Sequence, residues 1–163
     1  MEEAKRNTEK EMITGSEALM RALKAEGVKT LFGYPGGSIM PVYDSLYDYT
    51  RGDKKIFNHV LVRHEQGAVH AAQGYARVSG KVGVAIVTSG PGATNTLTGV
   101  ADAMLDSTPL VVIAGQVGIG ALGTDAFQEV DLVGVAQPIS KWSYQIRHAD
   151  DVAWAVSRAF YIA

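Results

Sequence analysis

The sequence contains no cysteine among its 163 residues. A disulfide framework, a thiolate nucleophile and a cysteine-based zinc site are therefore excluded. The chain also lacks a basic excess, with 15 lysines and arginines against 17 aspartates and glutamates, whereas nucleic-acid-binding domains usually have one. No apolar run approaches the roughly 20 residues that cross a bilayer. These absences predict a protein that binds neither nucleic acid nor membrane.

Several common catalytic motifs are also missing. The four histidines show no metal-ligand spacing, and neither a G-x-S-x-G nucleophile elbow nor a Walker A sequence is present. One segment, GIGALG at 118–123, formally matches the dinucleotide-binding pattern. It follows a predicted strand, but no convincing helix starts there, and no acidic residue closes a second strand about 20 residues later, as ribose binding requires. A dinucleotide-binding module using Gly118 to Gly123 stays an alternative from a different functional class.

The composition is that of one globular domain. Hydrophobic residues make up 47% of the chain and charged residues 20%, which is typical of a protein with a sizeable core. The first residues, MEEAKRNTEKEM, are charged and contain no apolar signal core. We therefore expect a disordered lead-in over 1–12, a single domain over 13–163, and a cytoplasmic location.

From residue 14 onward, helical and strand patterns alternate. Thr14 and Glu17 form a capping-box pattern, which begins a helix ending near Gly27. Further helices are predicted over 38–49, 65–79, 94–106 and 149–162, and strands over 29–34, 58–63, 82–90, 109–116 and 140–146. Continuously apolar strands alternating with helices are typical of buried parallel sheets. The sequence thus predicts an α/β fold, with an open, mostly parallel sheet and helices on both faces.

Loops with unusual residues follow four of these strands, at 34–38, 63–67, 88–95 and 115–123. In such sheets, ligands bind outside the carboxyl ends of the strands. One loop places Glu65 in front of a helix rich in glycine and alanine. The helix dipole alone favours a carboxylate there by roughly 0.3–1 kcal/mol, but it does not explain the small residues, which we expect to allow close packing. In TSGPGATN at 88–95, glycines permit close approach of a ligand, and Thr94 or Asn95 is predicted to cap the next helix.

Together these segments resemble the pyrimidine-binding domain of thiamine-diphosphate enzymes, whose fold is flavodoxin-like, and more closely the large catalytic subunit of the acetolactate synthase family. The similarity runs from Thr14 to the end of the chain. It rests on GYPGGSIMPVYD, RHEQGAVHAAQGYAR, VTSGPGATN, DAMLDSTPLVVIAGQV and GTDAFQE. The glutamate and TSGPGATN segments are shared across the superfamily, whereas YPGG and GTDAFQE are similar to acetolactate synthases in particular.

The resemblance implies a role for Glu65. In this family the corresponding glutamate hydrogen-bonds to N1′ of the cofactor's aminopyrimidine ring, and proton exchange there lets the 4′-amino group accept the thiazolium C2 proton. Thiamine diphosphate then attacks a 2-oxo acid and stores the electrons after CO2 leaves. Glu65 is the implied catalytic residue.

Other positions carry over one at a time. Tyr34, Pro35 and Gly37 match residues bordering the cofactor and the reacting centre. Phe127 and Gln128 match residues near the substrate, and Gln128 also lies near the cofactor. The pyrimidine-side wall is matched by Thr88, Pro91 and Asn95.

The resemblance also implies groups outside this chain. Magnesium and the diphosphate are held in the superfamily by a GDG-type motif, which these 163 residues lack, and FAD contacts lie in later domains. We therefore expect a fragment of a longer flavoprotein transferase of branched-chain amino-acid biosynthesis. It would be inactive alone, act on 2-oxo acids, form a homodimer with the active site at its interface, and bind a small regulatory subunit.

Two further points concern inhibitor binding and the alternative enzymes. The family frequently has proline where this chain has Gly118, which predicts a more flexible loop and makes inhibitor binding there doubtful. A thiamine-diphosphate 2-oxo acid decarboxylase is a close alternative, although the DAFQE segment favours the synthase. Glyoxylate carboligase is disfavoured because that relative lacks the glutamate.

Overall fold

A computed structural model describes residues 11–163, which form an α/β fold around a parallel sheet. The strands are β1 (Thr30–Gly33), β2 (Asn58–Leu61), β3 (Gly83–Val87) and β4 (Leu110–Ala114). Their order is β2-β1-β3-β4, and every pairing is parallel. This is the flavodoxin-like order, in which the strand sequence reverses between β1 and β3. The predicted fold class is confirmed.

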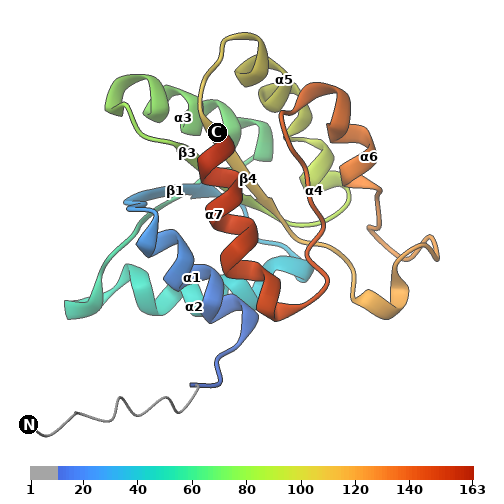
Figure 1. Ribbon diagram of the computed structural model, residues 1–163, viewed down its shortest axis with the longest axis horizontal. Helices are drawn as coiled ribbons and strands as arrows, with labels where there is room; N and C mark the ends of the chain where they lie inside the picture. The colour runs from blue at the N-terminus through green and yellow to red at the C-terminus, as the bar shows by residue number, and fades with distance from the viewer. Residues whose placement is uncertain (1–10) are drawn as a thin grey trace, which may run out of the picture.

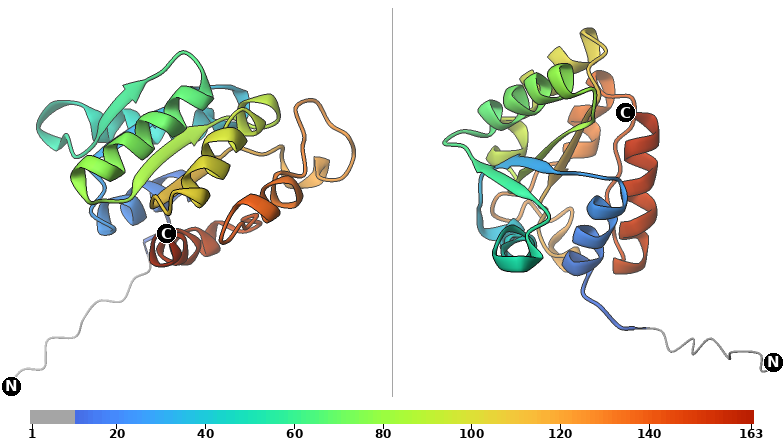
Figure 2. Two further views of the ribbon diagram at one scale, coloured as in Figure 1. Left: turned by 90° about the horizontal axis from the view of Figure 1, so that it is seen from above. Right: turned by 90° about the vertical axis from the view of Figure 1, so that its left-hand side faces the viewer.

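Helices cover both faces of the sheet, as Figure 1 and the right-hand view of Figure 2 show. The helices are α1 (Gly15–Ala25), α2 (Met40–Thr50), α3 (Glu65–Ser79), α4 (Pro91–Thr94), α5 (Leu97–Leu105), α6 (Leu132–Ala136) and α7 (Val152–Ile162). Helices α1, α2 and α7 pack on one face, and α3 and α5 on the other. The connection after β1 therefore lies on one face and the connection after β3 on the other, which opens a crevice at the carboxyl ends of β1 and β3.

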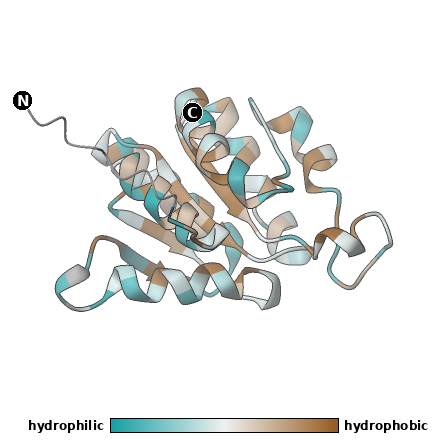
Figure 3. Ribbon diagram, turned by 60° about the horizontal axis from the view of Figure 1, so that its bottom comes forward, coloured by the Kyte–Doolittle hydropathy of each residue, from teal (hydrophilic) through white to brown (hydrophobic). Residues whose placement is uncertain are grey.

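The core consists of two apolar layers separated by the sheet. Leu31, Val84 and Ile86 point into the layer beneath α1, α2 and α7. Their neighbours Phe32 and Ala85 point the other way, against the alanines of α3, because successive strand residues alternate between faces. All five residues of β3 are buried, and the central strands are largely brown in Figure 3. Strand β3 is thus the centre of the fold.

Helix α1 begins as predicted, with one difference. Thr14 is the N-cap, and its hydroxyl accepts a hydrogen bond from the Glu17 amide at 3.1 Å. The Glu17 side chain does not complete the capping box. Its Oε1 instead accepts hydrogen bonds from Arg21 Nε at 2.8 Å and from the Tyr49 hydroxyl at 2.7 Å. These two donors, Arg21 first, hold the pKa of the Glu17 carboxyl below its usual range.

The predicted strand at 140–146 is wrong, because this segment has no regular structure. Trp142 and Tyr144 do point to one side, as alternation would place them. Their rings stack at 5.6 Å and meet Trp154 of α7 edge-on. Lys141 Nζ donates to the carbonyl of Ile162 at 3.1 Å. The alternating pattern therefore reflects packing against α7 rather than pairing with the sheet.

Two further expectations need correction. Strand β2 was expected to be buried, but it is an edge strand with an exposed Leu61. The close packing expected of every small residue in α3 holds only in part. A Cβ at Gly67 or Gly74 would meet nothing within 4 Å, whereas a Cβ at Gly83 of β3 would lie 2.2 Å from the Ala72 carbonyl oxygen. The close approach between α3 and the sheet therefore depends on Gly83 and on the buried alanines.

Residues 1–10 lie outside the described part of the chain, so the predicted lead-in is seen only at residues 11 and 12, which have no regular structure. The domain boundaries stay a prediction. Within residues 11–163, none of the helices has both the length and the apolar character needed to cross a membrane.

Candidate functional site

Glu65 is the first residue of α3 and lies beyond the carboxyl end of β2. The preceding residue, His64, is the N-cap, and its Nδ1 accepts a hydrogen bond from the Gln66 amide at 3.2 Å. The Glu65 residue is only 7% exposed. A carboxylate that is nearly buried is costly unless it is hydrogen-bonded, so its partners decide what it can do.

Asn95 is that partner. Its Nδ2 donates to Glu65 Oε2 at 2.9 Å. None of the described residues donates a hydrogen bond to Oε1 of Glu65. Every fully buried side-chain nitrogen or oxygen among the described residues has a hydrogen-bond partner, so Oε1 is not fully buried. Oε1 is therefore accessible from outside the protein. One carboxylate oxygen is fixed and the other is free to accept or share a proton with a ligand.

The sequence predicts that Thr94 or Asn95 caps the next helix, but the structure shows a different arrangement. The helix expected over 94–106 begins earlier, at Pro91, and is broken between α4 and α5. Thr96 is the N-cap of α5 but makes no capping side-chain bond, and Thr94 Oγ1 donates back to the Pro91 carbonyl at 3.2 Å. Neither Thr94 nor Asn95 caps the helix. Instead, the break turns Asn95 toward Glu65.

The turn after β3 requires glycine at two positions. A Cβ at residue 92 would lie 2.6 Å from Thr88 Cγ2 and 3.1 Å from Glu65 Oε1. Gly90 has φ +56°, where L side chains are strained, and a Cβ there would lie 2.6 Å from the Gln128 carbonyl oxygen. The two glycines keep the space beside Glu65 open and let the chain at Gln128 approach.

Thr88 connects this turn to the loop after β1. Its Oγ1 is 3.1 Å from Ser38 Oγ, which also accepts a hydrogen bond from the Ser89 amide at 3.0 Å. A Cβ at Gly36 would lie 2.6 Å from Thr88, and a Cβ at Gly115 would lie 2.3 Å from Ser38 Oγ. Three strand-end loops thus meet in close contact, as the parallel order predicts.

The remaining residues of the YPGG and GPG turns lie at the rim. Tyr34 is 39% exposed, and its amide is held by the Ile86 carbonyl at 3.1 Å. Pro35 is half-buried, and Gly37 is exposed with open space where a Cβ would stand. Pro91 is exposed at the first turn of α4. These four residues lie in the segments that follow β1 and β3, at the carboxyl edge of the sheet.

The outer loop places its two predicted residues differently. The main chain of Gln128 packs against Gly90, so Gln128 is brought to the crevice. Phe127 is 88% exposed and projects outward. The left-hand view of Figure 2 shows this segment, in orange, extending from the body of the domain. The structure gathers Glu65, Thr88, Asn95 and Gln128, and leaves Phe127 apart.

Two residues of the site were not singled out from the sequence. Ser38 ends the PGGS turn, and a hydroxyl directly after paired glycines is a recognisable sign of a turn that binds a neighbour. Glu129 ends DAFQE and accepts hydrogen bonds from the amides of Gly123, Thr124 and Ala126. An acidic residue closing a glycine-containing loop was the available signal.

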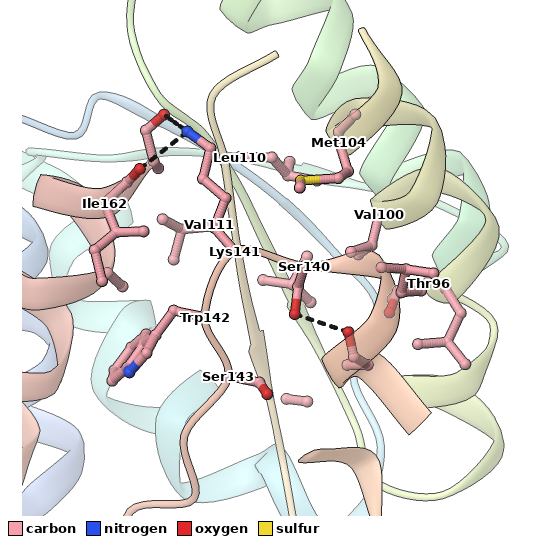
Figure 4. Close-up of a pocket in the computed structure, with 18 of the residues that line it drawn as sticks. Thr96, Val100, Met104, Leu110, Val111, Ser140, Lys141, Trp142, Ser143 and Ile162 are labelled. Atoms are coloured by element: carbon pink, nitrogen blue, oxygen red, sulfur yellow. Dashed lines mark hydrogen bonds between the residues drawn. The ribbon is translucent and has the colours of Figure 1, made fainter. Parts of the chain in front are cut away.

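An apolar cavity lies elsewhere, as Figure 4 shows. It has a volume of about 250 Å³ and an apolar lining that includes Val100, Met104, Leu110 and Trp142. None of the predicted site residues lines it. Segment 118–123 forms only a 3₁₀ turn, Ile119–Ala121, so it lacks the helix N-terminus that dinucleotide binding uses. The described residues contain no group of three acidic or histidine side chains that could hold a metal ion.

The fold and the crevice define a class of protein. A flavodoxin-like sheet with a carboxylate at its carboxyl edge, held on one oxygen and open on the other, is a common setting for ligand binding. Residues 13–135 match the family described as thiamine pyrophosphate enzyme, N-terminal TPP binding domain. The chain belongs to this family.

Three curated relatives of the chain are all acetolactate synthases. The chain is 53% identical over 150 residues to the acetolactate synthase large subunit of Lactococcus lactis, covering 92% of this chain and 25% of that protein. It is 53% identical over 153 residues to acetolactate synthase of Mycobacterium bovis, covering 94% and 24%. It is 50% identical over 153 residues to the Escherichia coli isozyme 3 large subunit, covering 94% and 26%. The chain thus spans about a quarter of the length of these relatives.

Proposed function

We propose that this chain is the N-terminal, pyrimidine-binding domain of an acetolactate synthase large subunit, extending over residues 13–163. The observation that carries the proposal is the Glu65 carboxylate, which is nearly buried, held on one oxygen by Asn95 at 2.9 Å, and open on the other. The identity of about half to acetolactate synthases over more than nine-tenths of this chain supports it.

Thiamine diphosphate fits the residues present. Its aminopyrimidine ring needs an acid that exchanges a proton with a ring nitrogen, and Oε1 of Glu65 is free for this. Gly92 leaves the adjacent space unfilled, since a Cβ there would crowd both Thr88 and Glu65. When bound, the cofactor supplies a carbon nucleophile for the substrate carbonyl and an electron sink for loss of CO2.

The chain's own residues divide the remaining work. Glu65 holds and moves the proton at Oε1, while Asn95 fixes Oε2 so that the carboxylate keeps one orientation. Thr88 and Pro91 form the wall beside the ring, and Tyr34, Pro35 and Gly37 border it from the loop after β1. Gln128 faces the substrate from the outer loop, whereas Phe127, exposed on the same loop, is assigned to the substrate by the resemblance alone. These roles are carried over from the family resemblance to the residues at the matching positions.

The full-length protein would condense two pyruvates, or pyruvate with 2-oxobutyrate, in branched-chain amino-acid synthesis. We propose that Mg2+ and FAD bind outside this chain, that the active site is completed by a second subunit, and that a small regulatory subunit can bind. The length of the relatives supports these additions. The exposed Leu61 and Phe127, at 64% and 88%, are suited to being covered by a partner.

The test is the product formed from pyruvate by the full-length protein with thiamine diphosphate, Mg2+ and FAD. We expect acetolactate from wild type, a loss of at least about tenfold in Glu65→Gln, and no comparable loss in Glu26→Gln. Glu26 is exposed at the end of α1, so this control makes the same chemical change away from the crevice. Acetaldehyde in place of acetolactate would assign the protein to the decarboxylases, and a Glu65→Gln variant of normal activity would remove Glu65 from the mechanism.

A further inference from the structure

We infer that Glu129 is a positioning residue for substrate binding, because its carboxylate holds together the loop that carries Phe127 and Gln128. This inference rests on the proposed function for the identity of the substrate, a 2-oxo acid. The role of Glu129 in ordering the loop is independent of the proposed function.

The contacts of Glu129 are concentrated on one loop. Its Oε1 accepts from the Gly123 amide, and its Oε2 accepts from the amides of Thr124 at 3.3 Å and Ala126 at 3.1 Å. The Glu129 amide in turn donates to the Ala126 carbonyl at 2.9 Å. Converging backbone amides form an anion-binding concavity, and here the chain fills it with its own carboxylate.

The other hydrogen bonds within the loop lie at its start, in the 3₁₀ turn Ile119–Ala121 and from Thr124 to the Ala121 carbonyl, so residues 125–128 depend on Glu129. The loop extends from the domain (Figure 2), and the Phe127 side chain is 88% exposed. Two of its residues, Asp125 and Gln128, have positive φ of 57° and 61°, a conformation that costs free energy in residues with a side chain. Without the amide contacts of Glu129, these two residues would relax toward ordinary backbone angles.

Glu129 also connects the loop to the rest of the domain. The next residue, Val130, accepts a hydrogen bond from Gln116 Nε2 at 2.9 Å, directly after β4. On the other side, Gln128 packs against Gly90 of the turn beside Glu65. Glu129 therefore lies between two anchors, where ordering the loop fixes the position of Gln128 relative to the crevice.

The ionised form is the one that orders the loop. Hydrogen bonds from backbone amides, that of Gly123 first, hold the pKa of Glu129 below its ordinary value. A lowered pKa means that the contribution is complete above the ordinary value near 4.5 and is lost as the pH falls through the lowered pKa. The loop should be ordered throughout the neutral range and loosen only in acid.

The experiment compares Glu129→Gln and Glu26→Gln in the full-length protein by amide hydrogen exchange of peptides covering 118–131, together with pyruvate kinetics. We expect the amides of Gly123, Thr124 and Ala126 to exchange at least about tenfold faster in Glu129→Gln. The KM for pyruvate should rise several-fold with a smaller change in kcat. The Glu26→Gln control should match wild type in both.

Unchanged exchange in Glu129→Gln, with folding intact by circular dichroism, would overturn the inference. Faster exchange with unchanged pyruvate KM would overturn the link to substrate. Should Glu129→Gln fail to fold, wild-type exchange is measured, with correction for intrinsic rates, as the pH falls from 7 through the lowered pKa of Glu129, where protection of these amides should be lost while the core amides stay protected. A wild type that makes no acetolactate would defeat the proposed function and leave the exchange result to stand alone.

Discussion

The turn after β3 and the outer loop ending at Glu129 both contain left-handed residues, but they use them in opposite ways. In the turn, the left-handed position is Gly90, where a side chain would collide with the Gln128 backbone. In the loop, Gly123 is also left-handed, but two further left-handed positions, Asp125 and Gln128, keep their side chains. Packing dictates the residue type in the first case. In the second, a side chain is retained despite strain, which is typical of functional positions.

Gly90→Ala should break this arrangement most severely. The new Cβ would be strained at φ +56° and would lie 2.6 Å from the Gln128 carbonyl oxygen. We expect a loss of at least about 2 kcal/mol in unfolding free energy, measured by urea denaturation. Gly37→Ala is the matched control, because nothing lies within 4 Å of its Cβ position, and it should change stability by less than about 0.5 kcal/mol. Equal losses in the two variants would contradict the packing argument.

Removing the Asn95 amide should have an intermediate effect. A hydrogen bond to a charged group contributes about 1.5–3 kcal/mol, so Asn95→Ala should destabilise the protein by that amount at neutral pH. In a Glu65→Gln background the acceptor is neutral, and the same change should cost only about 0.5–1.5 kcal/mol. A double-mutant cycle measures the difference. A coupling free energy of zero would show that the two side chains act independently.

Gln128→Gly should have the smallest effect on stability. Relief of strain at φ +61° is offset by the greater freedom of glycine in the unfolded chain, so we expect a change within about 1 kcal/mol. Pyruvate kinetics should nevertheless worsen, because the side chain is lost. A stable variant with unchanged kinetics would show that only the main chain of Gln128 matters.

Prediction from the sequence succeeded where a residue pattern is compatible with only one local structure. Continuous apolar runs marked β3 and β4, and the carboxylate before the alanine-rich helix marked Glu65. The sequence was least informative where a local pattern has two solutions. The sequence predicts Asn95 as a helix cap, but its side chain donates a hydrogen bond to Glu65 instead. The break between α4 and α5 directs Asn95 toward Glu65.

Long-range contacts explain the other differences. The alternation of Trp142 and Tyr144 resembled a strand, yet their rings pack on Trp154 of α7. For Glu129, the sequence shows an acidic residue closing a glycine-containing loop, but it does not show the partners, which are amides three to six residues away. Such contacts follow from the folded path of the chain and have no local signature.

The most direct test of the account is the rate at which the C2 proton of bound thiamine diphosphate exchanges with deuterium in the full-length protein. Oε1 of Glu65, left free by Asn95, should set this rate, so Glu65→Gln should slow exchange at least about tenfold while Glu26→Gln leaves it unchanged. Equal exchange rates in Glu65→Gln and wild type, with cofactor bound in both, would contradict the central role of Glu65.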